Sequence, residues 1–372
     1  MNPVPFLSLF HQHQAIREQL NTVFQNTLDA GYFVAGREVG AFEQEYARFN
    51  GVTHCVSVGN GLDALICCLQ AAGIGTGDEV IVPSHTCFAT WLAVDKVGAV
   101  PVPVEVDSKK YTIDPDRIVS AIGRKTKAIL PVHLYGYPCA MEEIMTIAEG
   151  HGLRVIEDNA QAQGAIYHGR ITGSWGHVNA TSFYPTKNLG ALGDGGAVTT
   201  NDEKVYQFIR AFHNYGSMEK DIFDYKGINS RLDELQAAIL RVKLQHLNLW
   251  NDERRMLAGV YHKGLEGIGD LQLPDQGNHQ ARPVFHLYVI QTQYRDQLKK
   301  YLHQNGVETA IHYPRAIHLQ KAFKTLGYQQ GAFPIAEQIS QCALSLPLWP
   351  GLSHHQQERV IATIKEFFAH HL

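Results

Sequence analysis

The sequence has few cysteines, no long apolar run and no excess of basic residues. Its six cysteines among 372 residues include no CxxC pair, which argues against a disulfide framework or a metal site and favours a reduced, cytoplasmic setting. No stretch approaches the roughly 18 consecutive apolar residues of a membrane span, and the N-terminal segment does not have the pattern of a secretory signal. A net charge of −4 (32 basic minus 36 acidic residues) gives no reason to expect nucleic acid or a membrane as partner. A soluble cytoplasmic enzyme is expected.

Short apolar runs alternate with amphipathic stretches through the first two-thirds of the chain. The predicted strands are Cys55–Val58, Val80–Val82, Val100–Val104, Ala128–Val132 and Val155–Ile156, and the predicted helices are Leu62–Ala71, Ala89–Val97, Pro115–Ala121 and Met141–Gly150. This alternation is typical of βαβ units and predicts an α/β fold with a mostly parallel sheet. The strands are apolar on both faces, as in a sheet covered by helices on both sides.

A long helical pattern follows from Leu232 to about Gly264, with apolar residues spaced to form one face. After it come strand-like HLYVI, helices near 295–304 and 337–342, strand-like ALSLP and a last helix near 353–368. We therefore predict a large α/β domain over residues 1–245 and a smaller α+β domain over 246–372, with the long helix joining them.

Polar residues follow three of the apolar runs. Asp158 and Gln161 come after VIE, Lys187 lies in YPTKNLG, and Gly59-Asn60-Gly61 opens a helix after CVSV. In α/β sheets, ligands bind at the carboxyl ends of the strands. Each feature has an ordinary structural explanation, such as a helix N-cap, a solvated lysine or a tight turn.

Taken together, these residues describe one cofactor site. A glycine-containing helix N-terminus offers free N–H groups to a phosphate. A carboxylate at a strand end can keep a pyridine nitrogen protonated, and a nearby lysine can form a Schiff base. These three groups are what pyridoxal phosphate (PLP) requires.

Several longer motifs carry a family resemblance that runs nearly end to end. They include GNGLDAL (59–65), PVHLYG (131–136), IEDNAQAQGA (156–165), SFYPTKNLGALGDGGAV (182–198), GINSRLDELQAAILRVKL (227–244) and IHYP (311–314). The sequence resembles the PLP-dependent sugar aminotransferases, which have the aspartate-aminotransferase fold and act on nucleotide-linked keto-deoxysugars. The members that aminate C3 of dTDP-3-keto-6-deoxyhexoses are the most similar.

The resemblance implies a role for each matching residue of the cofactor site. Lys187 matches the lysine that binds the cofactor covalently and later moves a proton. Asp158 matches the partner of the pyridine nitrogen, and Gln161 matches a residue near the ring hydroxyl. The phosphate contacts match Asn60, Gly61 and Ser182.

The resemblance also implies a homodimer with shared active sites. Asn229 matches a residue that reaches the phosphate from the neighbouring subunit, and Arg231 is either a further contact or half of a structural ion pair. The residues expected to contact the substrate are Tyr184, Arg231, His312, Tyr313 and His318.

Two positions depart from the family pattern. Cys87 stands where an aromatic residue usually stacks on the cofactor ring, so either its neighbour Phe88 takes over the stacking or a small residue covers the ring. Phe88 as a core side chain is the other interpretation. Gln163 stands where many members have histidine, a change that affects substrate fit rather than covalent chemistry.

The expected reaction transfers an amino group from L-glutamate to a keto-sugar. GNGLDAL and ATWLAV (89–94) resemble members that act at C3, and amination at C4 is the alternative. A dehydratase relative has histidine in place of the lysine, so Lys187 argues against that activity. A non-catalytic sensor with the same fold is the alternative from another class, and the intact Lys187, Asp158 and Gln161 argue against it.

Overall fold

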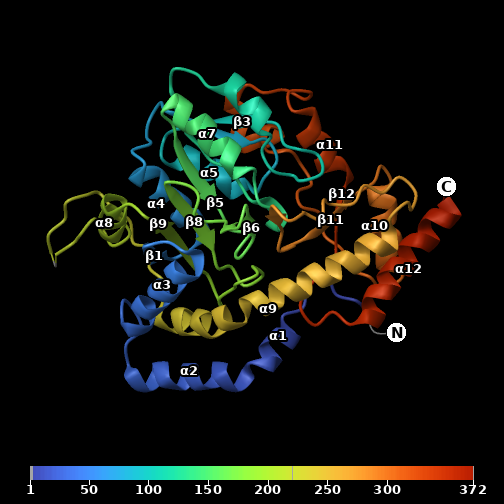
Figure 1. The fold of residues 1–372 in the computed structure, drawn as a ribbon, viewed down its shortest axis with the longest axis horizontal. Helices are drawn as coiled ribbons and strands as arrows, with labels where there is room; N and C mark the ends of the chain where they lie inside the picture. Colours follow the sequence, from blue (N-terminus) through green and yellow to red (C-terminus); the bar gives the residue numbers. More distant parts are fainter. Residues whose placement is uncertain (1–2, 220, 372) are drawn as a thin grey trace.

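The computed structural model describes residues 3–219 and 221–371 and has a seven-stranded sheet at its centre (Figure 1). The strand order is β1-β9-β8-β5-β4-β2-β3. The strands are β1 (His54–Val58), β2 (Glu79–Pro83), β3 (Val100–Val104), β4 (Thr126–Ile129), β5 (Arg154–Asp158), β8 (Val178–Ser182) and β9 (Gly196–Thr200). Only β9 is antiparallel to its neighbours in this sheet. The predicted α/β fold with a mostly parallel sheet is confirmed.

Helices cover both faces of the sheet, which explains why its strands are apolar throughout. In β2, Val80 and Val82 belong to the core cluster that contains side chains of α4 (Gly61–Ala71) and α5 (Phe88–Lys96). Ile81 points the other way, into the cluster that contains side chains of α7 (Met141–His151). All three β2 side chains are fully buried, as period-two alternation between two covered faces requires.

The long helix predicted from Leu232 to Gly264 is α9 (Glu234–Leu265), which extends into the C-terminal part of the molecule (Figure 1). Its first half packs Leu240 and Leu247 into a core cluster with β1 and β9, and its second half packs Leu257 and Tyr261 into the C-terminal core. The predicted domain boundary between residues 245 and 246 lies inside this unbroken helix. The N-terminal Val4 belongs to the C-terminal core. The two-domain division remains a prediction.

The C-terminal part is built on a pair of antiparallel strands. They are β11 (Tyr288–Gln291) and β12 (Ala343–Leu346), and the helices around them are α10 (Arg295–Gln304), α11 (Pro334–Cys342) and α12 (His354–His371). These elements match the runs expected from the sequence. A small sheet consists of β6 (Ile166–Tyr167), β7 (Arg170–Ile171) and β10 (Ala281–Arg282). It pairs strands that precede α9 in the sequence with one that follows it.

Among the α-helices of the described residues, four were not expected from the sequence: α1 (Phe10–Ala15), α2 (Arg17–Ala30), α3 (Arg37–Asn50) and α8 (Glu203–Phe212). The remaining short helices are α6 (Pro115–Ile118), η1 (Val119–Ala121), η2 (Leu134–Gly136), η3 (Ile317–Leu319) and η4 (Lys321–Leu326). Figure 1 shows α2 lying along α9 at the lower edge of the molecule. All six cysteines are free thiols. In the part of the chain that the structure describes, no helix is long and apolar enough to cross a membrane.

Candidate active site

The end of β5 places a buried carboxylate at the edge of the sheet. Asp158 is only 4% exposed, and its two oxygens accept hydrogen bonds from Thr90 Oγ1 at 3.0 Å and from the Ala160 N–H at 3.1 Å. Burial raises the pKa of Asp158, and these hydrogen bonds and the Lys187 charge oppose the rise. A cationic partner in the site would stabilise the charged form of this buried carboxylate.

Lys187 lies on the loop between β8 and β9, with its side chain half-buried. Burial lowers the pKa of Lys187, while Cys87 and Asp158 act in the opposite direction. A lowered pKa increases the share of neutral amine, the form that acts as nucleophile and base. The next residue, Asn188, donates to Asn251 Oδ1 of α9 at 2.8 Å, and the buried Lys243 of the same helix donates to the Gly190 carbonyl at 2.7 Å. The loop that carries Lys187 is thus fixed to α9.

The N-terminus of α4 faces the end of β8. Asn60 caps this helix by accepting from the Asp63 N–H at 2.9 Å, which leaves the earlier N–H groups of the first turn without an intrahelical acceptor. A Cβ atom on Gly61 would lie 2.6 Å from Ser182 Cβ, and one on Gly196 would lie 2.4 Å from the Asn60 carbonyl oxygen. Only glycine permits this close approach. Asn60, Gly61 and Ser182 therefore lie together, and their role as phosphate contacts remains a prediction.

Two glutamines follow Asp158 and link it to other parts of the site. Gln161 accepts from the Tyr135 N–H at 2.7 Å and donates to the Tyr313 hydroxyl at 3.2 Å. Gln163 donates to the Ser182 carbonyl at 2.7 Å. Gln161 thus contacts the IHYP segment, and Gln163 holds Ser182 in place.

The two residues at the start of α5 have different surroundings. Cys87, the N-cap of α5, is half-buried, and burial, together with this neighbouring thiol, raises the pKa of the Tyr313 hydroxyl. The Phe88 ring lies 5.3 Å from the Phe323 ring and packs on the main core cluster. That contact favours the core interpretation of Phe88 over ring stacking.

The residues predicted to bind substrate lie in two places. His312 lies close enough to Lys187 that its charge, after burial, contributes to lowering the pKa of His312 to about 4. Tyr313 contacts Gln161 through its hydroxyl. Tyr184 is on the Lys187 loop and is 52% exposed.

His318 is the exception among these residues. It is buried, pairs with Glu337 Oε1 of α11 at 3.0 Å and has its ring 5.0 Å from that of Phe333. This placement is that of a packing residue in the C-terminal part, and the structure does not bring His318 together with Lys187.

Asn229 and Arg231 lie on the segment between α8 and α9. Asn229 is exposed and its backbone pairs with Asn214. Arg231 donates to Asn214 Oδ1 at 3.2 Å and lies over the Tyr215 ring at 5.8 Å. Within residues 3–219 and 221–371, Arg231 has no carboxylate in ion-pair range, so the ion-pair alternative is not seen.

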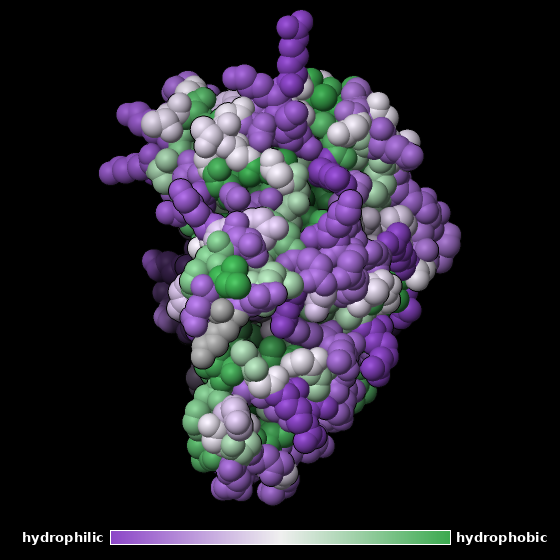
Figure 2. All heavy atoms as spheres, turned by 90° about the vertical axis from the view of Figure 1, so that its left-hand side faces the viewer, coloured by the Kyte–Doolittle hydropathy of each residue, from purple (hydrophilic) through white to green (hydrophobic). Residues whose placement is uncertain are grey.

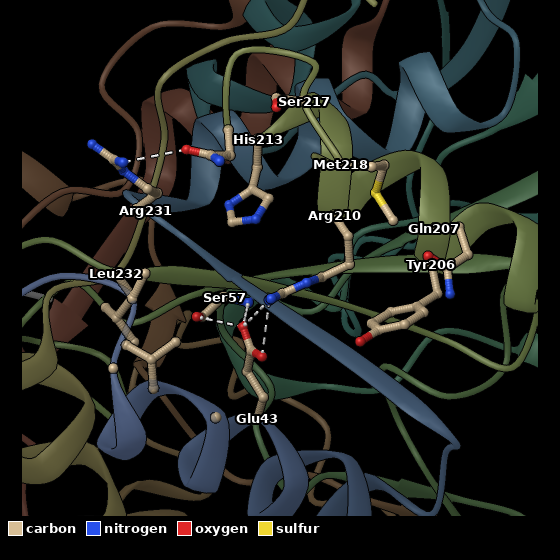
Figure 3. A pocket seen from close by; sticks show the side chains of 15 residues that line it. Glu43, Ser57, Tyr206, Gln207, Arg210, His213, Ser217, Met218, Arg231 and Leu232 are labelled. Carbon is tan, nitrogen blue, oxygen red and sulfur yellow. Dashed lines mark hydrogen bonds and ion pairs between the residues drawn. The ribbon is translucent and has the colours of Figure 1, made fainter. Parts of the chain in front are cut away.

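Arg231 also lines a cavity of about 410 Å³ beside α3 and α8. In Figure 3, Arg210, Glu43 and Ser57 are joined in this cavity, and Arg231 lies to one side and points away from them. The Arg210–Glu43 contact is 3.2 Å. Lys187, Asp158, Gln161, Asn60, Gly61 and Ser182 are not among the residues that line this cavity.

Three site neighbours were missed from the sequence: His85, Thr90 and Tyr135. All are buried, and all lie in or beside stretches that match the family, PSHT, ATWLAV and HLYG. Their contacts join residues far apart in the chain. The family motifs were therefore the only signal in the sequence that could have identified them. In the described part of the chain, no group of three or more His, Cys, Asp or Glu could hold a metal ion.

The sequence matches the DegT/DnrJ/EryC1/StrS aminotransferase family over residues 14–365. The chain belongs to this family. It is 48% identical to the erythromycin biosynthesis sensory transduction protein EryC1 of Saccharopolyspora erythraea, over 97% of this chain and 99% of that protein. It is 44% identical to the dTDP-3-amino-3,4,6-trideoxy-alpha-D-glucose transaminase of Streptomyces venezuelae, over 98% and 96%.

Solved structures agree with this assignment. The crystal structure of S. venezuelae DesV superposes with a TM-score of 0.96 at 44% identity, covering 99% of both chains. NtdA of Bacillus subtilis, solved with its cofactor PMP, superposes with a TM-score of 0.90 at 31% identity, covering 99% of this chain and 86% of that one. The chain is thus a PLP-dependent aminotransferase with the aspartate-aminotransferase fold.

The residues present fit this cofactor. The glycine-lined first turn of α4 and Ser182 form a cradle that a single Cβ atom would fill, which suits a phosphate group. Asp158 supplies a buried carboxylate for a protonated ring nitrogen, and Lys187 supplies an amine whose pKa is lowered. Those three groups belong to one site because the Asp158 and Lys187 charges affect each other and Ser182 ends the strand before the lysine loop.

Proposed function

We propose that this aminotransferase moves the amino group of L-glutamate to the keto carbon at C3 of a dTDP-linked 3-keto-6-deoxyhexose, as a cytoplasmic homodimer. The main support is the joint placement of Lys187, Asp158 and the α4 N-terminus in one site. The 44% identical S. venezuelae relative carries the name of a dTDP-3-amino sugar transaminase, which supports the substrate class.

Lys187 would hold the cofactor through its Nζ atom and, as a free amine, would take a proton from the donor's α-carbon. PLP, when bound, supplies an electron sink for the charge left on that carbon. Asp158 keeps the ring nitrogen protonated, so that the sink stays effective. Asn60, Gly61 and Ser182 would hold the phosphate, and Gln161 would contact the ring hydroxyl. The same groups act in reverse order when the sugar receives the amine.

The IHYP segment and the lysine loop form the sugar side of the site in this proposal. His312 is neutral at physiological pH, because burial and the Lys187 charge lower its pKa to about 4. A neutral imidazole accepts as well as donates hydrogen bonds, which suits sugar hydroxyls. Tyr184 and Tyr313 supply further hydroxyl groups, and Arg231 supplies a cation for a phosphate or carboxylate.

A homodimer would complete the site, because Asn229 is exposed on its own chain and is free to reach a partner's phosphate. Figure 2 shows apolar patches among polar groups on one face of the molecule. The large apolar side chains that are exposed include Phe24, Leu28, Tyr32, Phe33, Val34, Tyr215, Met218, Ile222, Phe223 and Tyr225. Such a concentration of exposed apolar groups is typical of a protein interface.

The direct test is a panel of amino donors and nucleotide-linked keto-sugars, with the product identified by NMR. We expect the cofactor absorbance to change on adding glutamate and the new C–N bond to form at C3 of a dTDP sugar. A product aminated at C4 would support the alternative regiochemistry. Ligand binding without turnover, and a cofactor that no donor alters, would support the sensor alternative.

A further inference from the structure

Tyr135 contacts both the cofactor side of the site and its sugar side. It lies in η2, just beyond the end of β4, with 4% of its surface exposed. Its backbone has φ +57°, in the left-handed region, an uncommon conformation for a non-glycine residue. Its N–H donates to Gln161 Oε1 at 2.7 Å, and its hydroxyl donates to the His312 carbonyl, 177 residues away in the sequence.

The directions of these hydrogen bonds follow from the groups involved. A carbonyl oxygen only accepts, so the single hydroxyl proton of Tyr135 points to His312. His85 Nε2 lies 2.8 Å from the same hydroxyl and must therefore be the donor. Burial lowers the pKa of His85 to about 3, so its ring is neutral with the proton on Nε2. The order of donation is His85 to Tyr135 to His312.

His312 is held at two points as a result. Its carbonyl accepts from Tyr135, and its Nδ1 atom lies 2.8 Å from Ser345 Oγ on β12. Since both nitrogens of an imidazole lie in one plane, fixing the backbone and Nδ1 also fixes the direction of Nε2. Nε2 is left for another partner, and the Lys187 charge acts on this ring.

We propose that Tyr135 is a positioning residue that sets the fit of the acceptor sugar by holding His312 and Gln161 in one fixed arrangement. This inference rests on the proposed sugar aminotransferase function. In this role Tyr135 acts through the backbone of the IHYP segment and the side chain of Gln161. Loss of its hydroxyl would free the His312 carbonyl and leave His85 Nε2 without an acceptor.

The test is Tyr135→Phe in the holoenzyme, compared with Tyr111→Phe. Tyr111 is a matched control because it is 3% exposed, its ring lies 5.1 Å from that of Tyr135, and its hydroxyl also hydrogen-bonds, to the Val289 carbonyl at 3.3 Å. We expect Tyr135→Phe to raise KM for the keto-sugar by about 10- to 100-fold, as loss of a buried hydrogen bond does. The half-reaction with glutamate, followed by cofactor absorbance, should change by less than about threefold. Tyr111→Phe should lower the melting temperature and leave both constants near wild type.

His85→Leu is a second variant, in case Tyr135→Phe does not fold. It removes the donor that orients the Tyr135 hydroxyl, so the sugar KM should rise, by less than in Tyr135→Phe. If both single variants fold, the double variant should have the same sugar KM as Tyr135→Phe alone, because the two side chains act through one chain of hydrogen bonds.

Equal sugar KM values for Tyr135→Phe and Tyr111→Phe would overturn the inference, as would His85→Leu with wild-type KM. Failure of the wild-type enzyme to aminate any sugar would instead overturn the proposed function. The two failures are therefore distinguishable.

Discussion

The first turn of α4 touches the end of β8 at Gly61 and Ser182, where a Cβ atom on the glycine would lie 2.6 Å from the serine Cβ. The contact leaves no room for a side chain beside the predicted phosphate position. Because Ser182 precedes the lysine loop by only a few residues, any shift here also moves Lys187.

Gly61→Ala should therefore weaken cofactor binding by about tenfold or more, since the added methyl group must push α4 away from Ser182. A titration of apoenzyme with PLP, followed by absorbance, measures the effect. Gly75→Ala is the matched control, because a Cβ atom there meets nothing within 4 Å. Equal affinities of the two variants would argue against a phosphate site at this helix end.

Asp158→Asn should lower kcat by on the order of 10²- to 10⁴-fold, since the amide keeps the shape of the carboxylate and loses its charge. The ring nitrogen would then lose its proton, and cofactor absorbance should shift while binding persists. Asp202→Asn changes an exposed helix N-cap of α8 and should leave kcat unchanged, because asparagine caps helices equally well. A fully active Asp158→Asn enzyme would exclude the proposed role of this carboxylate.

Shared active sites predict complementation between two inactive variants. In a mixed dimer of Lys187→Ala and Asn229→Ala chains, one site has both native residues. Random mixing should restore about a quarter of wild-type activity, since half of the dimers are mixed and each has one native site. Gel filtration before and after mixing controls for dimer formation. Activity no greater than the average of the two separate variants would mean that Asn229 acts within its own chain.

The local motifs predicted the central sheet and the cofactor residues because strand, turn and reactive group lie next to one another in the sequence. Asp158 follows its strand directly, and Lys187 lies five residues after the end of β8. The helix α2 was missed because it is polar over most of its surface and packs on α9, a contact between distant segments.

The same limit applies to the sugar side of the site. The family resemblance predicts His318 near the substrate, and in the structure its ring pairs with Glu337 of α11. Tyr135 was missed because its partner His312 is 177 residues away. Sequence patterns report local structure, whereas the Tyr135–His312 contact depends on how the C-terminal part packs on the sheet and the His318–Glu337 contact on how η3 packs against α11.

The lowered pKa values of three buried or half-buried histidines predict that the protein loses stability in mild acid. The folded-state pKa is lowered from 6.5 to about 4 for His213 and His312 and to about 3 for His85. The unfolded chain therefore binds more protons than the folded one below about pH 6.5, so the free energy of unfolding is largest above that pH and falls toward pH 4. The buried His213 alone lowers the free energy of unfolding at pH 4 by up to roughly 3 kcal/mol relative to neutral pH.

Urea unfolding at pH 7.5, 6 and 5 measures this slope. His213→Asn keeps a donor for the Ser230 carbonyl, which His213 Nδ1 contacts at 3.0 Å, and should flatten the slope. His355→Asn, at an exposed position, should not change it. A stability that is constant from pH 7.5 to 5 would contradict the prediction.

Lys187→Ala should lower turnover by a factor on the order of 10⁴ or more, because it removes both the covalent attachment and the proton carrier. Some cofactor should still bind through Asp158 and the α4 cradle. Lys125→Ala, at an exposed position, is the control and should be fully active.

The most direct measurement is peptide mass spectrometry of the holoenzyme after borohydride reduction. The account predicts that the mass of the reduced cofactor is found on the peptide that contains Lys187, and that prior treatment with glutamate abolishes this labelling. An unmodified Lys187 in enzyme that retains its cofactor, or a label on another lysine, would contradict the account.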